Sequence, residues 1–187
     1  MQDDIIKAAE VLQSGGVILY PTDTIWGIGC DATNAEAVER IYEIKQRVDT
    51  KAMLVLLDSE SRLMQYIAEV PEVAWELLDV ADKPLTIIYP GAKNLAANLI
   101  AHDGSIGIRI TKDEFCRKLI SRFKKPIVST SANISGMPAA SNYREITEGI
   151  KQLADFIVSW KQEETARSKP SSIIRLGLGG QVEILRK

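Results

Sequence analysis

The chain has 187 residues, 45% of them hydrophobic, which is enough to build one domain around a substantial core. Its 23 basic and 25 acidic residues give a formal net charge of −2, which excludes a protein that grips polyanions through a global positive excess. No apolar run approaches the roughly 20 residues that span a bilayer, and the acidic start Met1-Gln2-Asp3-Asp4 lacks the basic region of a secretory signal, so we expect a cytoplasmic protein without membrane contact.

The N-terminal part alternates predicted helices with predicted strands. Apolar residues at helical spacing predict a helix over Asp4–Ser14, which Gly15-Gly16 then ends. The continuous apolar run Val17–Tyr20 predicts a strand that is covered on both faces. The segment Thr33-Asn34-Ala35-Glu36 has the pattern of a capping box and predicts the start of a second helix.

Interleaved helices and strands continue, and the chain closes with consecutive strands. Helices are predicted at Pro71, at the capping box Thr111-Lys112-Asp113-Glu114, and shortly after Asn142. The further predicted strands are Ala52–Leu57, Leu85–Tyr89, Ile106–Ile110, Pro126–Ser129, Phe156–Ser159, Ser172–Leu176 and Gln181–Leu185, the last two joined as a hairpin by Gly177–Gly180. The polar run Lys161–Lys169 is interpreted as a loop inside the domain, and the pattern predicts a single mixed α/β domain over residues 1–187.

The two cysteines, Cys30 and Cys116, are isolated in the sequence and have no CxxC partner. We interpret both as buried thiols rather than as a disulfide or as metal ligands, which suits a reducing compartment.

A first candidate binding loop, Tyr20–Gly27, follows the first predicted strand and contains two threonines, an aspartate and a glycine. Ligands usually bind beyond the carboxyl ends of strands in open α/β sheets. The alternative is an ordinary turn whose Thr and Asp side chains bond to their own backbone.

A second candidate is the cationic cluster Lys45, Arg47 and Lys51. Concentrated positive charge suits a triphosphate, because arginine pairs with phosphate oxygens through a fork of donors and lysine acts as a point charge. The alternative is that these residues only complement the dipole at the end of a helix.

A third candidate, Ser129–Gly136, places five hydroxyl or amide side chains after a predicted strand, where they suit a ribose, a phosphate or an amino acid. It has no partner base for a serine nucleophile, and the only histidine, His102, is interpreted as a solvated loop residue. Arg109 interrupts an apolar strand, so it lies either on a solvent face or in a site where an anion pairs with it. The sequence has no GxxxxGK[ST] loop, no GxGxxG and no zinc-ligand cluster, so any ATP binding does not use a P-loop.

In this order and over nearly the whole chain, the segments resemble the Sua5/YrdC family of threonylcarbamoyl-AMP synthases. The motifs that carry the resemblance are Gly16–Thr24 with Trp26-Gly27, Lys45-Gln46-Arg47, Pro84-Leu85-Thr86, Gly107-Ile108-Arg109, Ser129–Asn133 with Ser135-Gly136, Pro170-Ser171-Ser172 and Ile184-Leu185-Arg186.

The resemblance implies an open, twisted mixed sheet of the YrdC type with a large concave cleft. It also implies that L-threonine, bicarbonate and ATP, with Mg²⁺, are joined to threonylcarbamoyl-adenylate and pyrophosphate. A separate threonylcarbamoyl transferase complex then uses the adenylate to form N6-threonylcarbamoyladenosine at position 37 of tRNA, and contact with tRNA or double-stranded RNA is a further expectation.

The family's roles fall on matching positions. Those for threonine are Thr24, Arg109, Ser129 and Ser171, with Arg109 as the carboxylate partner. Those for ATP are Arg47, Lys51, Ser105, Ser131, Asn133 and Arg186, and Lys45 with Arg47 forms the expected catalytic pair near the phosphates. No metal ligand is assigned.

The sequence departs from the family at several positions. Trp26 replaces a common tyrosine, Asp82-Lys83 replaces a Pro-Gly pair, and Lys51 replaces an asparagine of some members. Leu56 stands where many members have a histidine that contacts threonine, which puts the choice of amino acid in doubt.

Two rival readings remain. One is a non-catalytic protein of the same fold that binds nucleotide or double-stranded RNA in its cleft, because fold alone does not decide function. The other is a carbamoyl-adenylate-forming module of a hydrogenase-maturation protein, which is usually part of a much longer chain.

Overall fold

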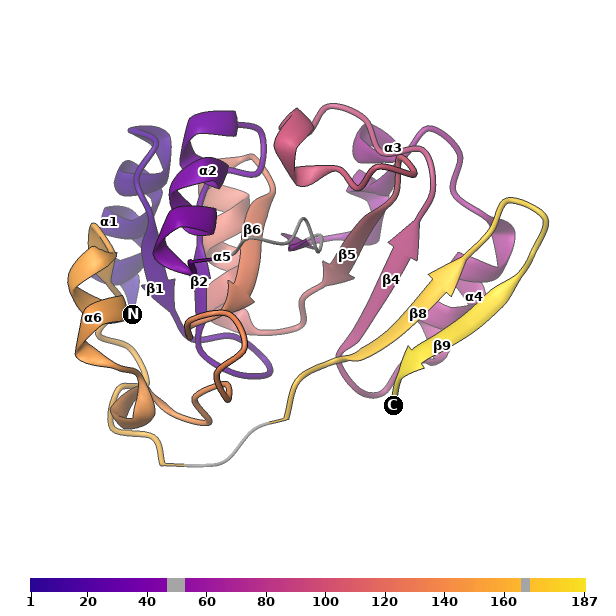
Figure 1. Cartoon of the computed structure of the whole chain (residues 1–187). Helices are drawn as coiled ribbons and strands as arrows, with labels where there is room; N and C mark the ends of the chain where they lie inside the picture. Colours follow the sequence, from indigo (N-terminus) through magenta and orange to yellow (C-terminus); the bar gives the residue numbers. More distant parts are fainter. Residues whose placement is uncertain (47–52, 166–168) are drawn as a thin grey trace.

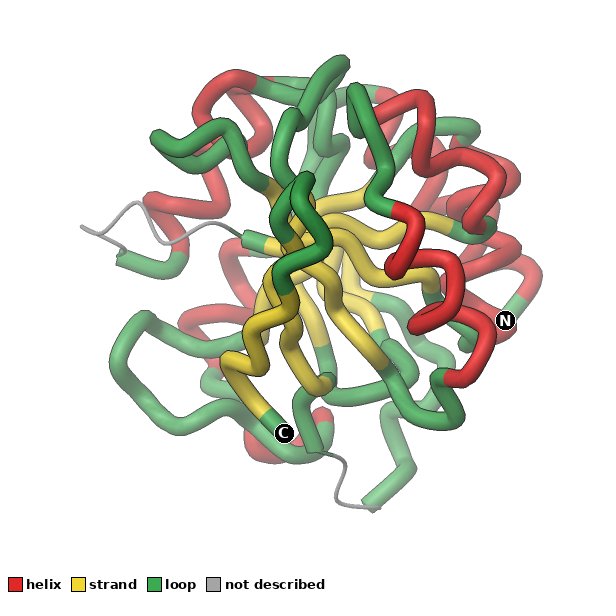
Figure 2. The backbone as a smooth tube through the Cα atoms, turned by 90° about the vertical axis from the view of Figure 1, so that its right-hand side faces the viewer, coloured by secondary structure: helices red, strands yellow, loops and turns green. Residues whose placement is uncertain are grey.

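The computed structural model describes residues 1–46, 53–165 and 169–187, and within them nine strands form one twisted mixed sheet with helices on both sides (Figures 1 and 2). The strands are β1 (Ile18–Tyr20), β2 (Gly27–Gly29), β3 (Leu54–Leu57), β4 (Leu85–Tyr89), β5 (Ile106–Ile110), β6 (Ile127–Ser131), β7 (Phe156–Ile157), β8 (Ser172–Leu176) and β9 (Val182–Arg186). Their order is β7-β1-β2-β6-β3-β5-β4-β8-β9. The pairs β1/β7, β3/β5 and β4/β8 are parallel and the other neighbours antiparallel, which confirms the predicted mixed α/β sheet.

The helices divide between the two faces of the sheet. They are α1 (Gln2–Gln13), α2 (Ala35–Ile44), α3 (Leu63–Tyr66), α4 (Glu72–Val80), α5 (Glu114–Phe123) and α6 (Glu148–Leu153), with 3-10 turns at Glu60–Arg62, Ala97–Leu99 and Tyr143–Glu145. Helices α1 and α5 pack against each other and, with β1, β3 and β6, enclose one apolar cluster. Apolar residues of α2, α3, α4 and α6 belong to the larger cluster on the opposite face. The sheet is therefore covered by helices over much of both faces.

Both predicted capping boxes begin too early. The residue that caps α2 is Asn34, whose Oδ1 accepts hydrogen bonds from the backbone N–H groups of Glu36 and Ala37, at 3.0 and 3.2 Å. Thr33 Oγ1 is engaged elsewhere, because it donates to the carboxylate of Asp31 at 2.7 Å. Helix α5 is likewise capped by Asp113, which accepts from the Cys116 N–H. In both helices a short Asn or Asp side chain takes the capping position.

Strand β2 was not predicted from the sequence, because Gly27 and Gly29 resemble a turn. The strand lies between β1 and β6, and a Cβ at Gly29 would overlap the carbonyl oxygen of Val128 on β6. Glycine therefore permits the close approach of the two strands at this point.

Other boundaries shift by small amounts. Strand β6 extends to Ser131 and β9 to Arg186, while β7 ends at Ile157. Pro71 precedes α4 as its cap, and the segment after Asn142 begins as a 3-10 turn before α6. Of the strand predicted over Ala52–Leu57, Ala52 lies outside the described residues.

The two cysteines are buried and unbonded to each other, as predicted. Burial raises the pKa of both thiols above the ordinary value, so neither is a thiolate at neutral pH. Among the helices that the structure describes, none combines the length and apolar character needed to cross a membrane.

Candidate active site

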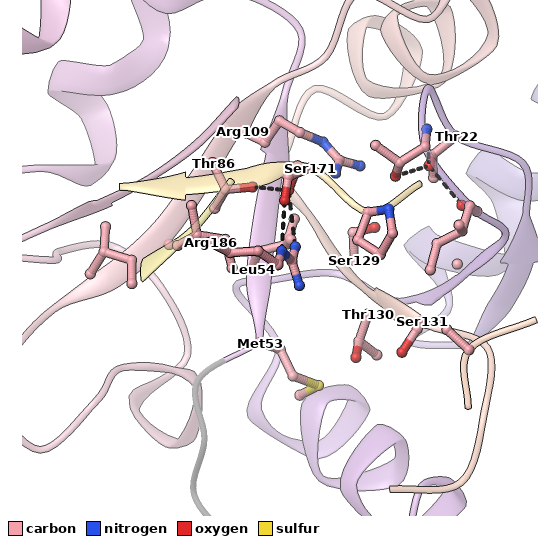
Figure 3. Close-up of a pocket in the computed structure, with 18 of the residues that line it drawn as sticks. Thr22, Met53, Leu54, Thr86, Arg109, Ser129, Thr130, Ser131, Ser171 and Arg186 are labelled. Atoms are coloured by element: carbon pink, nitrogen blue, oxygen red, sulfur yellow. Dashed lines mark hydrogen bonds between the residues drawn. The ribbon is translucent and has the colours of Figure 1, made fainter. Parts of the chain in front are cut away.

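A cavity of about 610 Å³ opens over the middle of the sheet and is lined by hydroxyl groups and arginines (Figure 3). Its polar lining residues are Thr22, Thr24, Thr86, Ser105, Arg109, Ser129, Thr130, Ser131, Ser171, Arg175 and Arg186. They come from β4, β5, β6, β8 and β9 and from the loops beside them. The described lining contains no carboxylate, so the cavity is locally cationic although the whole chain is slightly acidic.

The loop after β1 forms one wall of this cavity. Thr22 Oγ1 donates to the carbonyl of Ile25 at 2.7 Å and accepts from the backbone N–H of Thr24 at 3.1 Å. The hydroxyls of Thr22 and Thr24 lie 3.0 Å apart. These local bonds are those of an ordinary turn, and they also hold the buried Thr24 hydroxyl at the cavity wall. The segment is thus a self-bonded turn that also lines the cavity, and its role in binding stays a prediction.

Arg109 is the most buried cation of the lining, with 3% of its side chain exposed. Its Nη2 lies 3.1 Å from Asp23 Oδ1, but the contact lacks hydrogen-bond geometry. Arg109 Nε and Asp23 Oδ1 are both buried without a hydrogen-bond partner among the described residues. An unpaired buried donor is costly, so the guanidinium is suited to an incoming anion that accepts from it.

Ser171 links three segments at the cavity edge. Its hydroxyl lies 2.8 Å from Thr86 Oγ1 on β4, and its carbonyl accepts from Arg186 Nε on β9 at 2.8 Å (Figure 3). The pKa of Arg186 is lowered, first by its burial and then by the positive charge of Arg109. Arg109 and Arg186 thus repel each other within one cavity, and an anion between them would relieve that repulsion.

Lys45 lies outside the cavity lining, and its role at the phosphates stays a prediction. It is buried, and its Nζ donates to the carbonyls of Ser131 and Asn133 at 2.6 and 2.7 Å. Its own carbonyl accepts from the Ser135 N–H. The ammonium therefore holds the loop after β6 in place, since two carbonyl oxygens satisfy it there.

Asn133 also lies outside the lining, with its Nδ2 donating to the carbonyls of Ile134 and Met137. Its Oδ1 is buried and has no partner among the described residues. The predicted residues Arg47 and Lys51 fall outside the part of the chain that the structure describes.

The structure brings most of the predicted residues together. The cavity lining contains Thr24, Ser105, Arg109, Ser129, Ser131, Ser171 and Arg186. Sequence reasoning missed Thr86 and Arg175, although both interrupt apolar strands in the same way as Arg109. A polar residue within an apolar run was the signal that could have identified both Thr86 and Arg175.

Two further residues are placed as follows. His102 is exposed on a loop, as predicted. Leu56 is buried in the cluster formed with α1 and α5 and does not line the cavity. Across the described residues, no group of three or more His, Cys, Asp or Glu side chains could hold a metal ion.

A family model named for Sua5, YciO and YrdC, with the description "Telomere recombination", matches residues 10–187. The threonylcarbamoyl-AMP synthase of Vibrio campbellii is 35% identical over 176 residues, which cover 91% of each chain.

Two solved structures share the fold. The crystal structure of P. abyssi Sua5 complexed with L-threonine has a TM-score of 0.82 and 26% identity, and the match covers 92% of this chain. The chain spans about half, 50%, of the length of that Sua5 chain. E. coli YciO has a TM-score of 0.86 and 27% identity, with 100% of this chain and 90% of the other covered.

Proposed function

Because the chain belongs to the Sua5/YciO/YrdC family, we propose that it is an L-threonylcarbamoyladenylate synthase. It would join L-threonine, bicarbonate and ATP and release pyrophosphate. The name of the Vibrio campbellii relative and the L-threonine complex of P. abyssi Sua5 both support this activity. The observation that carries the proposal is the buried Arg109, whose Nε has no hydrogen-bond partner among the described residues beside a cluster of hydroxyls.

We assign the threonine subsite to Arg109, Thr24, Ser129 and Ser171, all of which line the cavity. The planar guanidinium of Arg109 matches a carboxylate, which would accept from its unpaired donors. The hydroxyls offer short donors and acceptors for the amine and side-chain hydroxyl of threonine. Asp23 remains in contact with Arg109 and limits where its guanidinium can turn.

We assign the nucleotide subsite to Ser105, Ser131 and Arg186 in the lining, together with Arg47 and Lys51. Lys45 and Asn133 shape the loop that presents Ser131. Lys45 contributes through the position of this loop, and its role with Arg47 near the phosphates remains part of the proposal.

The reaction needs few protein groups. The threonine amine attacks carbon dioxide and loses a proton to solvent to give a carbamate, or it reacts with bicarbonate with loss of water. A carbamate oxygen then attacks the α-phosphate of ATP, and the bond to pyrophosphate breaks. The cavity must orient two anions and balance the charge that develops, which Arg109 and Arg186 can do. No covalent nucleophile is required, which agrees with a lining of hydroxyls and arginines without a histidine.

Magnesium is expected with ATP, but the described lining offers no carboxylate, the usual protein ligand of Mg²⁺ in nucleotide sites. The described residues therefore do not fit a protein-held Mg²⁺. We treat the ion as part of the nucleotide substrate.

The further expectations belong to the same proposal. The chain acts as one domain in the cytoplasm, and its adenylate product passes to a separate threonylcarbamoyl transferase complex that modifies tRNA. An acyl-adenylate is a high-energy mixed anhydride that water hydrolyses, so its transfer must be prompt.

The test is pyrophosphate release by the pure protein with ATP, Mg²⁺ and bicarbonate, supplied with one amino acid at a time. Release that needs both threonine and bicarbonate, with threonylcarbamoyl-adenylate seen by mass spectrometry, is the expected result. Serine serves as the matched substrate, since it lacks only the methyl group of threonine. Nucleotide binding without pyrophosphate release for any amino acid would support the non-catalytic reading instead.

A further inference from the structure

Two hydroxyls and a guanidinium meet at one point of the cavity edge, and their hydrogen bonds decide where the hydroxyl protons go. Ser171 Oγ lies 2.8 Å from Thr86 Oγ1 and 3.4 Å from Arg186 Nη2. Figure 3 shows both contacts as dashed lines that meet at Ser171. Thr86 and Ser171 are both buried, with 2% of each residue exposed, so their protons have few possible acceptors.

Among the described residues, the Thr86 hydroxyl has one hydrogen-bond partner, Ser171 Oγ. A buried hydroxyl proton without an acceptor costs free energy, so the favoured arrangement has Thr86 donating to Ser171. If Ser171 donated instead, the Thr86 proton would have no acceptor in this part of the protein. The needs of Thr86 therefore set the direction of the bond.

Arg186 occupies the second lone pair of Ser171. A guanidinium has donors and no acceptor, so Arg186 Nη2 can only donate to Ser171 Oγ. A serine hydroxyl has one proton and two lone pairs. With Thr86 and Arg186 both donating to it, Ser171 has used its lone pairs, and its own proton has no acceptor among the described residues. Ser171 is therefore left as a donor only.

This donor belongs to the same cavity as Arg109. Thr86 on β4 is paired directly with Arg109 on β5, and directly opposed residues of antiparallel strands share one face of the sheet. Thr86, Ser171, Arg186 and Arg109 all line the cavity. The Ser171 proton and the Arg109 Nε–H group are thus two donors of one cavity that lack an acceptor in the described protein. Two such donors suit the two oxygens of a carboxylate.

A purely structural role accounts less well for the Thr86 hydroxyl. The backbone ladder between β4 and β8 already joins Leu85–Ile88 to Ser172–Arg175, so the strands do not depend on this side-chain bond. Thr86 also stands in an apolar run, where valine would have the same shape without a polar group to bury. The hydroxyl therefore has a use beyond strand pairing.

We propose that Thr86 is a positioning residue, which together with Arg186 fixes the Ser171 hydroxyl as a hydrogen-bond donor to the carboxylate of the amino-acid substrate. Thr86 acts through Ser171 and not through contact with the substrate. A group that only donates binds the carboxylate end of an amino acid and rejects its ammonium, so this network sets the orientation of the substrate. The inference rests on the proposed threonine subsite and adds the direction in which Ser171 bonds.

The test measures the affinity of the pure protein for L-threonine by isothermal titration calorimetry. Thr86→Val keeps the shape of the side chain and removes its hydroxyl, which frees the Ser171 hydroxyl to turn. We expect the affinity for L-threonine to fall about 10-fold, because a hydrogen bond to a charged group is misdirected, and the affinity for ATP to change by less than about twofold. Thr86→Ser should restore most of the affinity for L-threonine.

Thr111→Val is the matched control. Thr111 is also buried, its Oγ1 accepts from the Asp113 N–H at 3.2 Å, and it lies outside the cavity lining. This variant also loses a buried threonine hydroxyl, so it shows what the loss of such a group does to the fold alone. The affinity for L-threonine should stay that of the unmodified protein.

A double-mutant cycle separates positioning from packing. If Thr86 acts through Ser171, adding Thr86→Val to Ser171→Ala should weaken L-threonine binding little further, because the donor is already absent. Circular dichroism checks that each variant is folded, and Thr86→Ala takes the place of Thr86→Val if the valine variant does not fold.

Three results would overturn the inference. The first is unchanged affinity for L-threonine in the Thr86 or the Ser171 single variant. The second is a pair of losses that multiply in the double variant, which would mean that Thr86 acts independently of Ser171. The third is an equal loss in Thr111→Val, which would indicate a general effect on the fold. If the unmodified protein bound no L-threonine, the proposed function itself would fail, and this inference with it.

Discussion

The guanidinium of Arg109 lies 3.1 Å from the carboxylate of Asp23, yet the contact leaves Arg109 Nε without a hydrogen-bond acceptor. The ion pair therefore holds Arg109 in the cavity but leaves its Nε–H group without a hydrogen bond to a described residue. A ligand carboxylate can complete the bonding that the protein leaves open.

Replacing Arg109 with lysine keeps the charge but removes the planar fork. We expect the KM for threonine to rise about 10- to 100-fold, corresponding to a lost charge-assisted pair of about 1.5–3 kcal/mol, with a smaller change in the KM for ATP. Steady-state kinetics of pyrophosphate release measure both constants. Ser105→Ala is the matched control, and it should affect ATP more than threonine; equal rises for both substrates in the Arg109 variant would refute the carboxylate assignment.

Lys45→Met tests whether this lysine supports the loop after β6. The substitution leaves the carbonyls of Ser131 and Asn133 without their charged donor inside the protein. We expect the free energy of unfolding to fall by about 2–4 kcal/mol in urea titrations, because a buried charge-assisted network is broken. Lys118→Met removes an exposed pair with Glu114 and should change stability by less than about 0.5 kcal/mol. A stable Lys45→Met protein that lost only its affinity for ATP would instead place the ammonium at the phosphates.

Replacing Gly29 or Gly149 with alanine should change the free energy of unfolding in opposite directions. Gly29→Ala introduces a Cβ that overlaps the Val128 carbonyl oxygen between β2 and β6, so we expect a loss of at least about 3 kcal/mol or failure to fold. Gly149 lies in α6 with open space around it, and Gly149→Ala should raise the free energy of unfolding by up to about 1 kcal/mol. Thermal or urea unfolding compares the two variants, and similar effects in both would contradict the close packing of β2.

Asp155 should make the free energy of unfolding depend on pH in the acidic range. Hydrogen bonds from Arg40, and next from the backbone N–H of Val17, hold the pKa of this carboxyl below its ordinary value. A lowered carboxyl pKa stabilises the folded state above the unfolded pKa, and this contribution is lost as the pH falls through the folded pKa.

Asp155→Asn should therefore be less stable than the unmodified protein by about 1 kcal/mol at pH 7, because the pair is partly exposed. The difference should shrink below about pH 4 as the native carboxyl is protonated. Urea titrations across this pH range provide the measurement. A difference for Asp155→Asn that stays constant across this pH range would exclude the carboxyl as its source.

Strands β4, β5 and β8 were the most predictable part of the fold. Leu85–Tyr89, Ile106–Ile110 and Ser172–Leu176 occur where the apolar runs predicted them. An apolar run reports burial most directly in β5, which is covered on both faces, whereas β8 is only partly buried. Strand β2 escaped prediction because glycines chosen for close packing resemble a turn.

Residues of the cavity lining were predictable where a polar side chain stands out against its neighbours in the sequence. Hydroxyls crowded after a strand and a charge inside an apolar strand predicted Ser129 and Arg109. The position of Lys45 depends on carbonyls 86 and 88 residues away, so no local pattern distinguishes its support of a loop from contact with phosphate.

The bonds between Ser171 and Arg186 connect the last strand to a cavity whose first wall is built by Thr22. During synthesis on the ribosome, the segments before β8 can emerge and collapse long before residue 186 leaves the exit tunnel. The nascent chain therefore carries an incomplete binding surface until Arg186 has emerged. Ligands that recognise the completed cavity can stabilise this protein only once Arg186 has joined it, and they cannot guide the earlier folding steps.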